Sequence, residues 1–310
     1  MEFDRREDII AITPMWEGER YPNGRPKVSD KLLDALYDMT LEEVWKAIFL
    51  LGYESQFIKM DSLHPEFNSD GTVNRKLIGR AVTAAYVPIR PDYDLATRKI
   101  AEKKGYKGML PNQWIIDNLV DRDVIVIDLF DKIFQGTFIG GNLATAIKTK
   151  TNTGGAVIWG AIRDLEQVYS IPDIQVYYRG VDPTGLRKIS MLSYNMPVVL
   201  GSDRYAAVCL PGDVVYGCSG GVLFIPPHLL EEVIKTGRKS KVKDICGFKL
   251  LSENKFTAAE IDRLVWTKKM LDLLVDFIKN DPQGKEFQDL DWSEEYELAK
   301  QGEAYGQSAL

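Results

Sequence analysis

The chain has 310 residues, of which 45% are hydrophobic and 27% are charged, and its formal net charge is −6. This acidic balance gives no general attraction to nucleic acid or to an anionic membrane, and no apolar run reaches the length of a membrane span. The N-terminus also lacks the apolar core of a signal peptide, so we expect a cytoplasmic protein with neither nucleic acid nor membrane as a partner.

Few side chains are suited to thiolate or imidazole chemistry. The three cysteines, Cys209, Cys218 and Cys246, show no CxxC spacing, so neither a disulfide framework nor a zinc cluster is indicated. The two histidines, His64 and His228, do not lie in a nucleophile motif. Serine or cysteine nucleophiles activated by histidine are therefore not indicated.

The first 27 residues are polar and rich in turn formers, and we expect an arm that docks through Trp16 and Tyr21. Two helices should follow, over 31–37 and from about 40 to 51. Strands are predicted at 77–88, 124–128, 156–159, 174–178, 197–200, 206–210, 213–216 and 221–225. Helices are predicted at 90–107, 111–119, 142–154, 165–169, 229–235, 257–278 and 292–305.

The stretch from Gly140 to Asp164 contains the best candidate site. Asn142 follows a glycine pair and can cap a helix, whose first free N–H groups attract an anion. The predicted strand at 156–159 leads directly to Arg163 and Asp164. An arginine can clamp a carboxylate, and an adjacent acid can hold a hard divalent cation. If the loop folds back, both features face one pocket.

Each part of this stretch also has an ordinary structural explanation. A glycine pair before a helix is commonly plain loop geometry, and Asn142 can serve as a helix cap and nothing more. The dipeptide Arg163-Asp164 is commonly a surface ion pair.

Taken together, several motifs resemble the RraA-like proteins, which include the class II 4-hydroxy-4-methyl-2-oxoglutarate and 4-carboxy-4-hydroxy-2-oxoadipate aldolases. The resemblance runs from Val28 to Val233, about two thirds of the chain. The matching residues are Gly141-Asn142-Leu143-Ala144-Thr145-Ala146, Gly155, Val157-Ile158, Gly160-Ala161-Ile162-Arg163-Asp164, Pro211-Gly212-Asp213-Val214-Val215 and Gly221-Val222.

The resemblance implies an α/β fold, a layered β/β/α sandwich of the swivelling-domain type, with a helical C-terminal extension. It divides the chain into an arm (1–27), an RraA-like core (28–234) and the extension (235–310). It also implies a homo-oligomer, a trimer or a dimer of trimers, with sites between subunits.

The activity implied is that of a metal-dependent lyase acting on a small 2-oxo acid. It would cleave a 4-hydroxy-2-oxo acid to pyruvate, or decarboxylate oxaloacetate, through a metal-stabilised enolate. By resemblance, Asp164 binds the divalent cation, Mg²⁺ or Mn²⁺, and Arg163 contacts the substrate. Backbone amides of Gly141, Asn142 and Leu143 would hold the substrate carboxylate.

Two positions depart from the family pattern. Some relatives carry an acid at the position of Asn142, where it manages a proton through water. Asparagine cannot do this, although its amide can orient the water, and the change can instead mark a different substrate. Where many relatives carry consecutive acids, the chain has Tyr216 to Gly221, so we expect no metal ligand there and a packed thiol at Cys218.

Two other functions stay open. Some members of the family bind and inhibit an RNA-degrading endonuclease, so the chain can be a non-catalytic regulator. It can also be a lyase or dehydratase acting on sugar acids, with charge supplied by Arg90, Arg98 and Lys99.

The C-terminal part raises two further expectations. Glu231 and Glu232 are the nearest candidates for an acid that relatives supply from a neighbouring subunit, although both also suit a plain helix surface. The apolar face of the predicted helix at 257–278 should pack on a neighbouring protomer or cover the pocket mouth.

Overall fold

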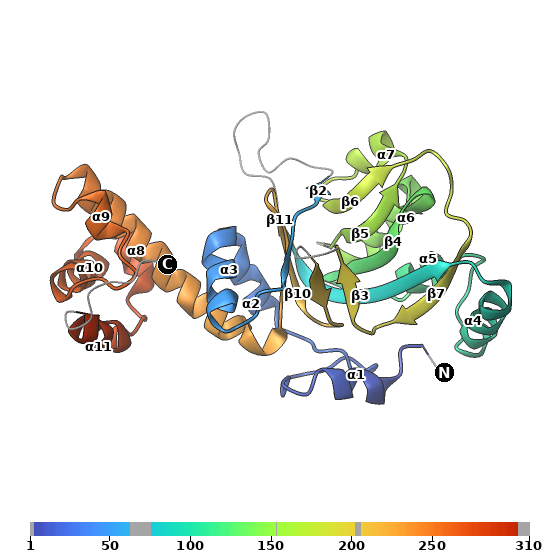
Figure 1. Cartoon of the computed structure of the whole chain (residues 1–310), viewed down its shortest axis with the longest axis horizontal. Coiled ribbons are helices and arrows are strands. Elements are labelled where there is room, and N and C mark those ends of the chain that lie inside the picture. The colour runs from blue at the N-terminus through green and yellow to red at the C-terminus, as the bar shows by residue number, and fades with distance from the viewer. Residues whose placement is uncertain (1–2, 63–75, 153, 202–205, 303–310) are drawn as a thin grey trace. The chain divides into compact units, whose positions relative to one another are not determined.

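The computed structural model describes residues 3–62, 76–152, 154–201 and 206–302 (Figure 1). His64 lies outside these described residues. The chain forms two compact units, Met1–Leu41 with Ile48–Glu231 and Glu42–Ala47 with Glu232–Leu310, called here the sheet unit and the helical unit. The division into 1–27, 28–234 and 235–310 stays a prediction.

Four parallel strands form the centre of the sheet unit. They are β3 (Leu77–Pro88), β4 (Asp123–Ile139), β5 (Ala156–Ile162) and β6 (Val176–Val181). In the described part of the chain they belong to a nine-stranded mixed sheet with the order β1-β11-β10-β3-β4-β5-β6-β2, in which β7 also pairs with β3. The other strands are β1 (Phe57–Ile58), β2 (Asp61–Ser62), β7 (Ile189–Tyr194), β10 (Val214–Cys218) and β11 (Gly221–Ile225).

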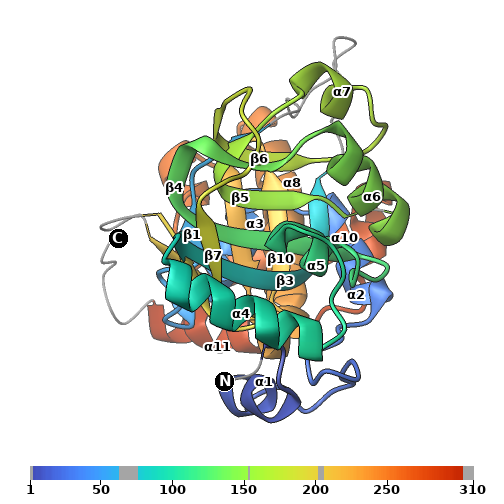
Figure 2. The same cartoon turned by 90° about the vertical axis from the view of Figure 1, so that its right-hand side faces the viewer.

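Successive side chains of a strand point to opposite sides, and in β3, β5 and the first half of β4 both sets are buried, so both faces of the sheet are covered there. One face packs under α5 (Pro111–Ile116) and α6 (Gly141–Thr151), which lie in front of the sheet in Figure 2. The other face packs against a two-stranded sheet of β8 (Val198–Leu200) and β9 (Ala207–Cys209). These layers confirm the predicted α/β fold class.

Strand β4 is longer than the sequence predicts. It runs for 17 residues, far past the predicted end at Asp128, and its register with β5 shifts three times. Phe130, Asp131 and Gln135 have positive φ angles, so the strand bends where its side chains become half-buried or exposed. Its last residues, up to Ile139, lead directly into α6.

Two more helices of the sheet unit were predicted close to their observed bounds. Helix α4 (Pro91–Lys103) begins with proline at its first position, and α7 (Leu165–Tyr169) follows β5. Before the sheet come α1 (Arg6–Ile12), α2 (Asp30–Ala35), a 3₁₀ turn (Leu36–Asp38) and α3 (Leu41–Leu50), and a second 3₁₀ turn (Pro227–Leu229) follows β11.

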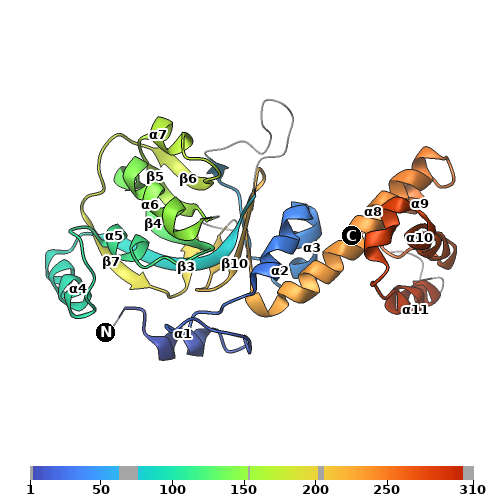
Figure 3. The same ribbon diagram turned by 180° about the vertical axis from the view of Figure 1, so that it is seen from behind.

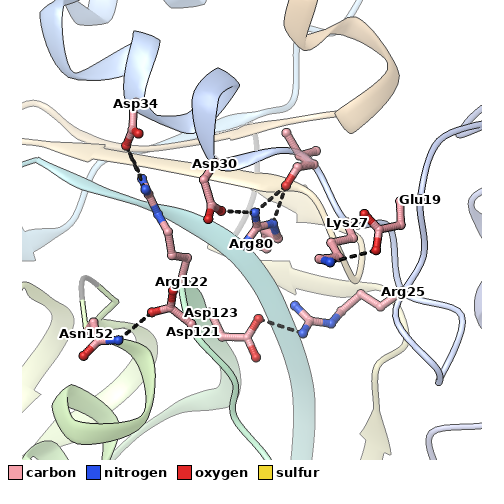
Figure 4. A network of polar contacts seen from close by, with 11 residues as sticks. Glu19, Arg25, Lys27, Asp30, Asp34, Arg80, Asp121, Arg122, Asp123 and Asn152 are labelled. Atoms are coloured by element: carbon pink, nitrogen blue, oxygen red, sulfur yellow. Dashed lines mark hydrogen bonds and ion pairs between the residues drawn. The ribbon is translucent and has the colours of Figure 1, made fainter.

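The N-terminal arm packs on the sheet unit through buried side chains. Phe3 is 2% exposed and Ile9 is fully buried. Arg25 places Nη2 2.7 Å from Oδ1 of Asp123, the first residue of β4 (Figure 4). Nearby, Arg80 bonds the backbone oxygen of Val28, so the junction between arm and sheet is held by buried arginines.

The helical unit buries its own apolar faces. It contains most of α8 (Leu230–Ser252), with α9 (Ala258–Ile261), α10 (Lys268–Asn280), a 3₁₀ turn (Pro282–Phe287) and α11 (Ser293–Gly302) (Figure 3). Among the described residues, no helix is long and apolar enough to cross a membrane.

The prediction of a single helix over 257–278 is wrong. The chain forms α9 and α10 instead, because the Thr267 side chain accepts the Met270 N–H and starts a new helix. The apolar face of α10, including Leu274, packs against Cys246 and Phe287 within the same unit. Burying such a side chain contributes about 1.5–3 kcal/mol. The face is thus covered within its own unit. A further contact with a neighbouring protomer or with the pocket mouth stays a prediction.

Candidate active site

Helix α6 begins at Gly141, immediately after β4, and Gly140 takes the N-cap position. Gly140 has extended φ and ψ angles of −138° and −167°, and its carbonyl accepts the Ala144 N–H at 3.0 Å. The prediction that Asn142 caps this helix is wrong. Asn142 is the second helical residue and is exposed, because the glycine already supplies the non-helical backbone that a cap requires.

The two glycines allow a neighbouring loop to approach the start of α6. A Cβ atom on Gly140 would lie 2.4 Å from Oδ2 of Asp164, and one on Gly141 would lie 2.2 Å from Oε1 of Gln167. Larger residues at these positions would push the side chains of Asp164 and Gln167 away. The glycine pair is therefore a packing requirement of this site as well as loop geometry.

Asp164 turns the chain back toward α6. It adopts the left-handed conformation, with φ 57° and ψ 42°, at the N-cap of α7. Its backbone oxygen accepts the Val168 N–H at 3.0 Å, and its Oδ2 accepts the Gly141 N–H at 3.3 Å. Asp164 thus joins the starts of both helices, and the loop after β5 folds back over the start of α6.

Arg163 lies beside this carboxylate without closing on it. Its Nε is 3.8 Å from Asp164 Oδ2, and the two side chains are 44% and 32% exposed. Its backbone N–H donates to the Ile139 oxygen at 3.1 Å, which fixes the end of β5 against the end of β4. An exposed pair of this length contributes about 0–1 kcal/mol to stability. The backbone of Arg163 is therefore fixed, while its guanidinium stays accessible.

The predicted anion-binding residues form the first turn of α6. Leu143 is half-buried against the core, and Asn142 faces solvent. The amides of Asn142 and Leu143 belong to the first turn, where N–H groups have no partner within the helix. Together with the Arg163 guanidinium, they are hydrogen-bond donors suited to a carboxylate.

The donor set at this place fits only certain cations. Among the described residues, no three His, Cys, Asp or Glu side chains form a group that could hold a metal ion. A lone carboxylate, Asp164, suits Mg²⁺ or Mn²⁺, which keep several waters and add ligands from the substrate. It does not suit structural zinc, which needs four protein ligands.

The remaining predicted positions lie elsewhere. Cys218 is buried on β10, as expected for a packed thiol, while Glu231 and Glu232 are exposed at the start of α8. Sequence reasoning did not assign a role to Gly140 or Gln167. The glycine pair was a signal for Gly140, whereas nothing in the sequence indicates that Gln167 lies over the first turn of α6.

Comparison with known proteins identifies the family. The family model described as RraA-like, Aldolase/RraA, matches residues 29–224. The chain is 28% identical over 204 residues to Protein DlpA of Legionella pneumophila, and the matched stretch covers 66% of this chain and 29% of that protein. It is 26% identical over 132 residues to the "Putative 4-hydroxy-4-methyl-2-oxoglutarate aldolase" of Halalkalibacterium halodurans, covering 43% of this chain and 60% of that protein.

The chain thus spans less than a third of the first relative and 60% of the second. The fold is similar to that of Streptomyces coelicolor RraAS2, described as an unusual member of the RNase ES inhibitor RraA protein family. The TM-score is 0.53 at 19% identity, over 74% of this chain and 98% of that one, and such a likeness shows the fold alone. Because the family match covers more than half of the sequence, the chain belongs to the RraA-like family.

Proposed function

We propose that the chain is a divalent-metal-dependent lyase that acts on a small 2-oxo acid. It would release pyruvate from a 4-hydroxy-2-oxo acid or from oxaloacetate. The observation that carries this proposal is the position of Arg163 and Asp164 against the first turn of α6, where Gly141 donates to Asp164 at 3.3 Å.

The chain's own groups suit a substrate with a carboxylate next to a carbonyl. The amides of Asn142 and Leu143 would hold the carboxylate. The Arg163 guanidinium would contact the adjacent oxygen and stabilise negative charge that develops there during bond cleavage. The helix amides are fixed before the substrate arrives, which is the condition under which such interactions accelerate a reaction.

Asp164 is the residue that would hold the cation. Its side chain is oriented by the Gly141 N–H and stays 32% exposed, so it can still accept a ligand. A divalent cation bound there would supply Lewis-acid polarisation of the 2-oxo group. The homo-oligomer, as a trimer or a dimer of trimers, remains part of this proposal.

Asn142 bears on the choice of substrate. Aldol cleavage requires a base for the 4-hydroxyl proton, whereas decarboxylation of oxaloacetate breaks a bond to a carboxylate and has no such proton to remove. Asn142 is neutral and cannot accept a proton, although its exposed amide can hold a water. This difference favours oxaloacetate over a 4-hydroxy-2-oxo acid as the better substrate.

The two alternatives, a lyase or dehydratase acting on sugar acids and a non-catalytic regulator of an endoribonuclease, are less well supported. Arg90 pairs with Asp92 at 2.9 Å, and Arg98 pairs with Asp94 at 2.7 Å. The charge of both arginines is already balanced, which leaves less of it to bind a sugar acid. A regulator that only binds an endoribonuclease has no physical need for an oriented Arg163-Asp164 pair beside free helix amides.

The test is pyruvate release from oxaloacetate and a panel of 4-hydroxy-2-oxo acids, with Mg²⁺, Mn²⁺ or excess chelator. We expect turnover only with metal, loss of turnover in Asp164→Asn, and normal turnover in Glu166→Gln, an exposed acid two residues away on α7. Because metal ions decarboxylate oxaloacetate slowly by themselves, each rate is taken above the metal-only rate. If the folded protein has no activity on any substrate and binds an endoribonuclease, the regulator would replace the lyase as the proposed function.

A further inference from the structure

A cavity of about 210 Å³ lies in the sheet unit apart from the candidate active site. One wall is the arm from Ile12 to Trp16, and the other includes Tyr53, Asp213 and His228. None of its lining residues belongs to β5, α6 or α7. The walls are mostly apolar and aromatic, so the cavity favours a ligand with an apolar body.

Asp213 is the charged group in this lining, and it is 4% exposed. Its Oδ2 accepts the Leu210 N–H at 2.7 Å. Among the described residues, no lysine or arginine forms an ion pair with it. Burial raises the pKa of Asp213 to about 7, and the Leu210 N–H opposes this rise only in part. A buried carboxyl without a counter-charge is costly once ionised, and a cation beside it would remove that cost.

The other polar groups of the wall are neutral. Tyr53 Oη lies 3.2 Å from His228 Nε2, and burial lowers the pKa of His228, so the pair carries no charge at neutral pH. Cys209 lies near the carboxyl, and burial together with the Asp213 charge holds its thiol pKa well above the usual value. Around the cavity, negative charge therefore comes from Asp213, with two aromatic rings, Trp16 and Tyr53, in the same lining.

We propose that this cavity binds a small organic ammonium ion with an apolar ring or chain, whose charged nitrogen pairs with Asp213. The ammonium would form a charge-assisted hydrogen bond with this buried carboxylate. Aromatic rings also attract cations, and the apolar walls would cover the rest of the ligand. This site is independent of the proposed lyase activity.

The volume of the cavity determines which probe ligand fits. An apolar cavity of about 150 Å³ is known to hold benzene, so a volume of about 210 Å³ can hold one ring with an aminomethyl group. Benzylamine fits this description. Benzyl alcohol has nearly the same shape without the charge, and it is the matched control ligand.

The experiment is calorimetric titration of the full chain with each probe. At pH 8 we expect benzylamine to bind at least tenfold more tightly than benzyl alcohol. Asp213→Asn, which can still accept the Leu210 N–H, should remove that preference and leave benzyl alcohol binding unchanged. In the unmodified protein, benzylamine should bind about tenfold more weakly at pH 6 than at pH 8, since Asp213 becomes protonated while the amine stays charged.

Several results would overturn the proposal. They are equal binding of the two probes, no binding of either at millimolar concentration, or an amine preference that survives Asp213→Asn. If Asp213→Asn does not fold, the pH dependence decides together with Ile12→Phe, which fills the cavity from the arm. Benzylamine affinity that is equal at pH 6 and pH 8, or that persists in Ile12→Phe, would show that Asp213 only closes the Pro211-Gly212 turn.

Discussion

Two aspartate–arginine pairs in the sheet unit differ in distance, burial and surroundings. Arg25 and Asp123 approach to 2.7 Å, and their side chains are 4% and 0% exposed. Arg163 and Asp164 are 3.8 Å apart, with 44% and 32% of their side chains exposed. The residue types are the same, so the difference in role comes from the environment.

The buried pair has further contacts on the arginine side. Arg25 also donates to the Ala81 oxygen at 3.3 Å and lies over the Tyr21 ring, 4.4 Å from its centroid. Burial raises the pKa of Asp123, and the charge of Arg25 opposes this rise. Such a pair fixes the arm to β4 and is not accessible to a ligand, because its side chains are almost completely buried. The open pair adds little stability and keeps its donors and acceptors accessible, which is what a binding site requires.

The largest expected effect is on stability. Arg25→Met would leave Asp123 buried without its cation and should lower the free energy of unfolding by about 3–5 kcal/mol. Urea denaturation measures this change, provided that the transition of the sheet unit is followed. Arg5→Met is the control, because Arg5 is 51% exposed and pairs with Asp8 at the surface. If Arg25→Met lowers the free energy of unfolding by less than about 1 kcal/mol, the buried pair contributes no more than a surface ion pair.

The next effect is on catalysis. Arg163→Lys keeps the charge but replaces a planar two-pronged donor with a flexible point charge. We expect about a hundredfold loss in kcat/KM for pyruvate release, equivalent to about 3 kcal/mol, with unchanged stability. Arg187→Lys, an exposed substitution outside the site, should leave both quantities unchanged. Unchanged kinetics in Arg163→Lys would make Arg163 a surface ion pair.

A smaller effect should follow from Gly140→Ala. The added Cβ would meet Oδ2 of Asp164 at 2.4 Å and Nε of Arg163 at 3.0 Å, so both side chains must shift. Because the backbone at Gly140 is extended, alanine adds no φ strain there. We expect about a tenfold loss of kcat/KM, in keeping with the sensitivity of catalysis to small displacements. Gly185→Ala is the matched control, since its Cβ would meet nothing within 4 Å, and equal kinetics in both variants would show that the close approach is unimportant.

The sequence predicted the regular parts of the fold well. Strand β3 and helix α7 occupy the predicted ranges. Strand β3 is a continuous run of small and β-branched residues, and α7 follows directly after the clear strand β5. Strand β7 was missed, since its polar residues, including Ser190 and Ser193, do not resemble a buried strand. The second half of β4 was missed for a different reason, because apolar and polar residues do not alternate regularly over 130–137.

The candidate site was predictable only where its residues are neighbours in sequence. Arg163 and Asp164 follow a clear strand, so their position at its end could be inferred. The start of α6 could not, because the cap is decided by the backbone angles of Gly140 and not by the side chain of Asn142. The pair of Arg25 and Asp123 joins distant segments, and no local pattern indicates it.

One measurement tests most directly whether the open pair serves function and the buried pair serves stability. It compares Asp164→Asn with Asp123→Asn. Asparagine tolerates the left-handed backbone of Asp164 and can still accept the Gly141 N–H, so the first variant should keep its unfolding free energy within about 0.5 kcal/mol. It should nevertheless lose metal-dependent pyruvate release. Asp123→Asn should be strongly destabilised, because Arg25 would then be buried without its anion, and it should retain turnover under conditions where it is folded. Metal-dependent pyruvate release by Asp164→Asn at the normal rate would contradict the account.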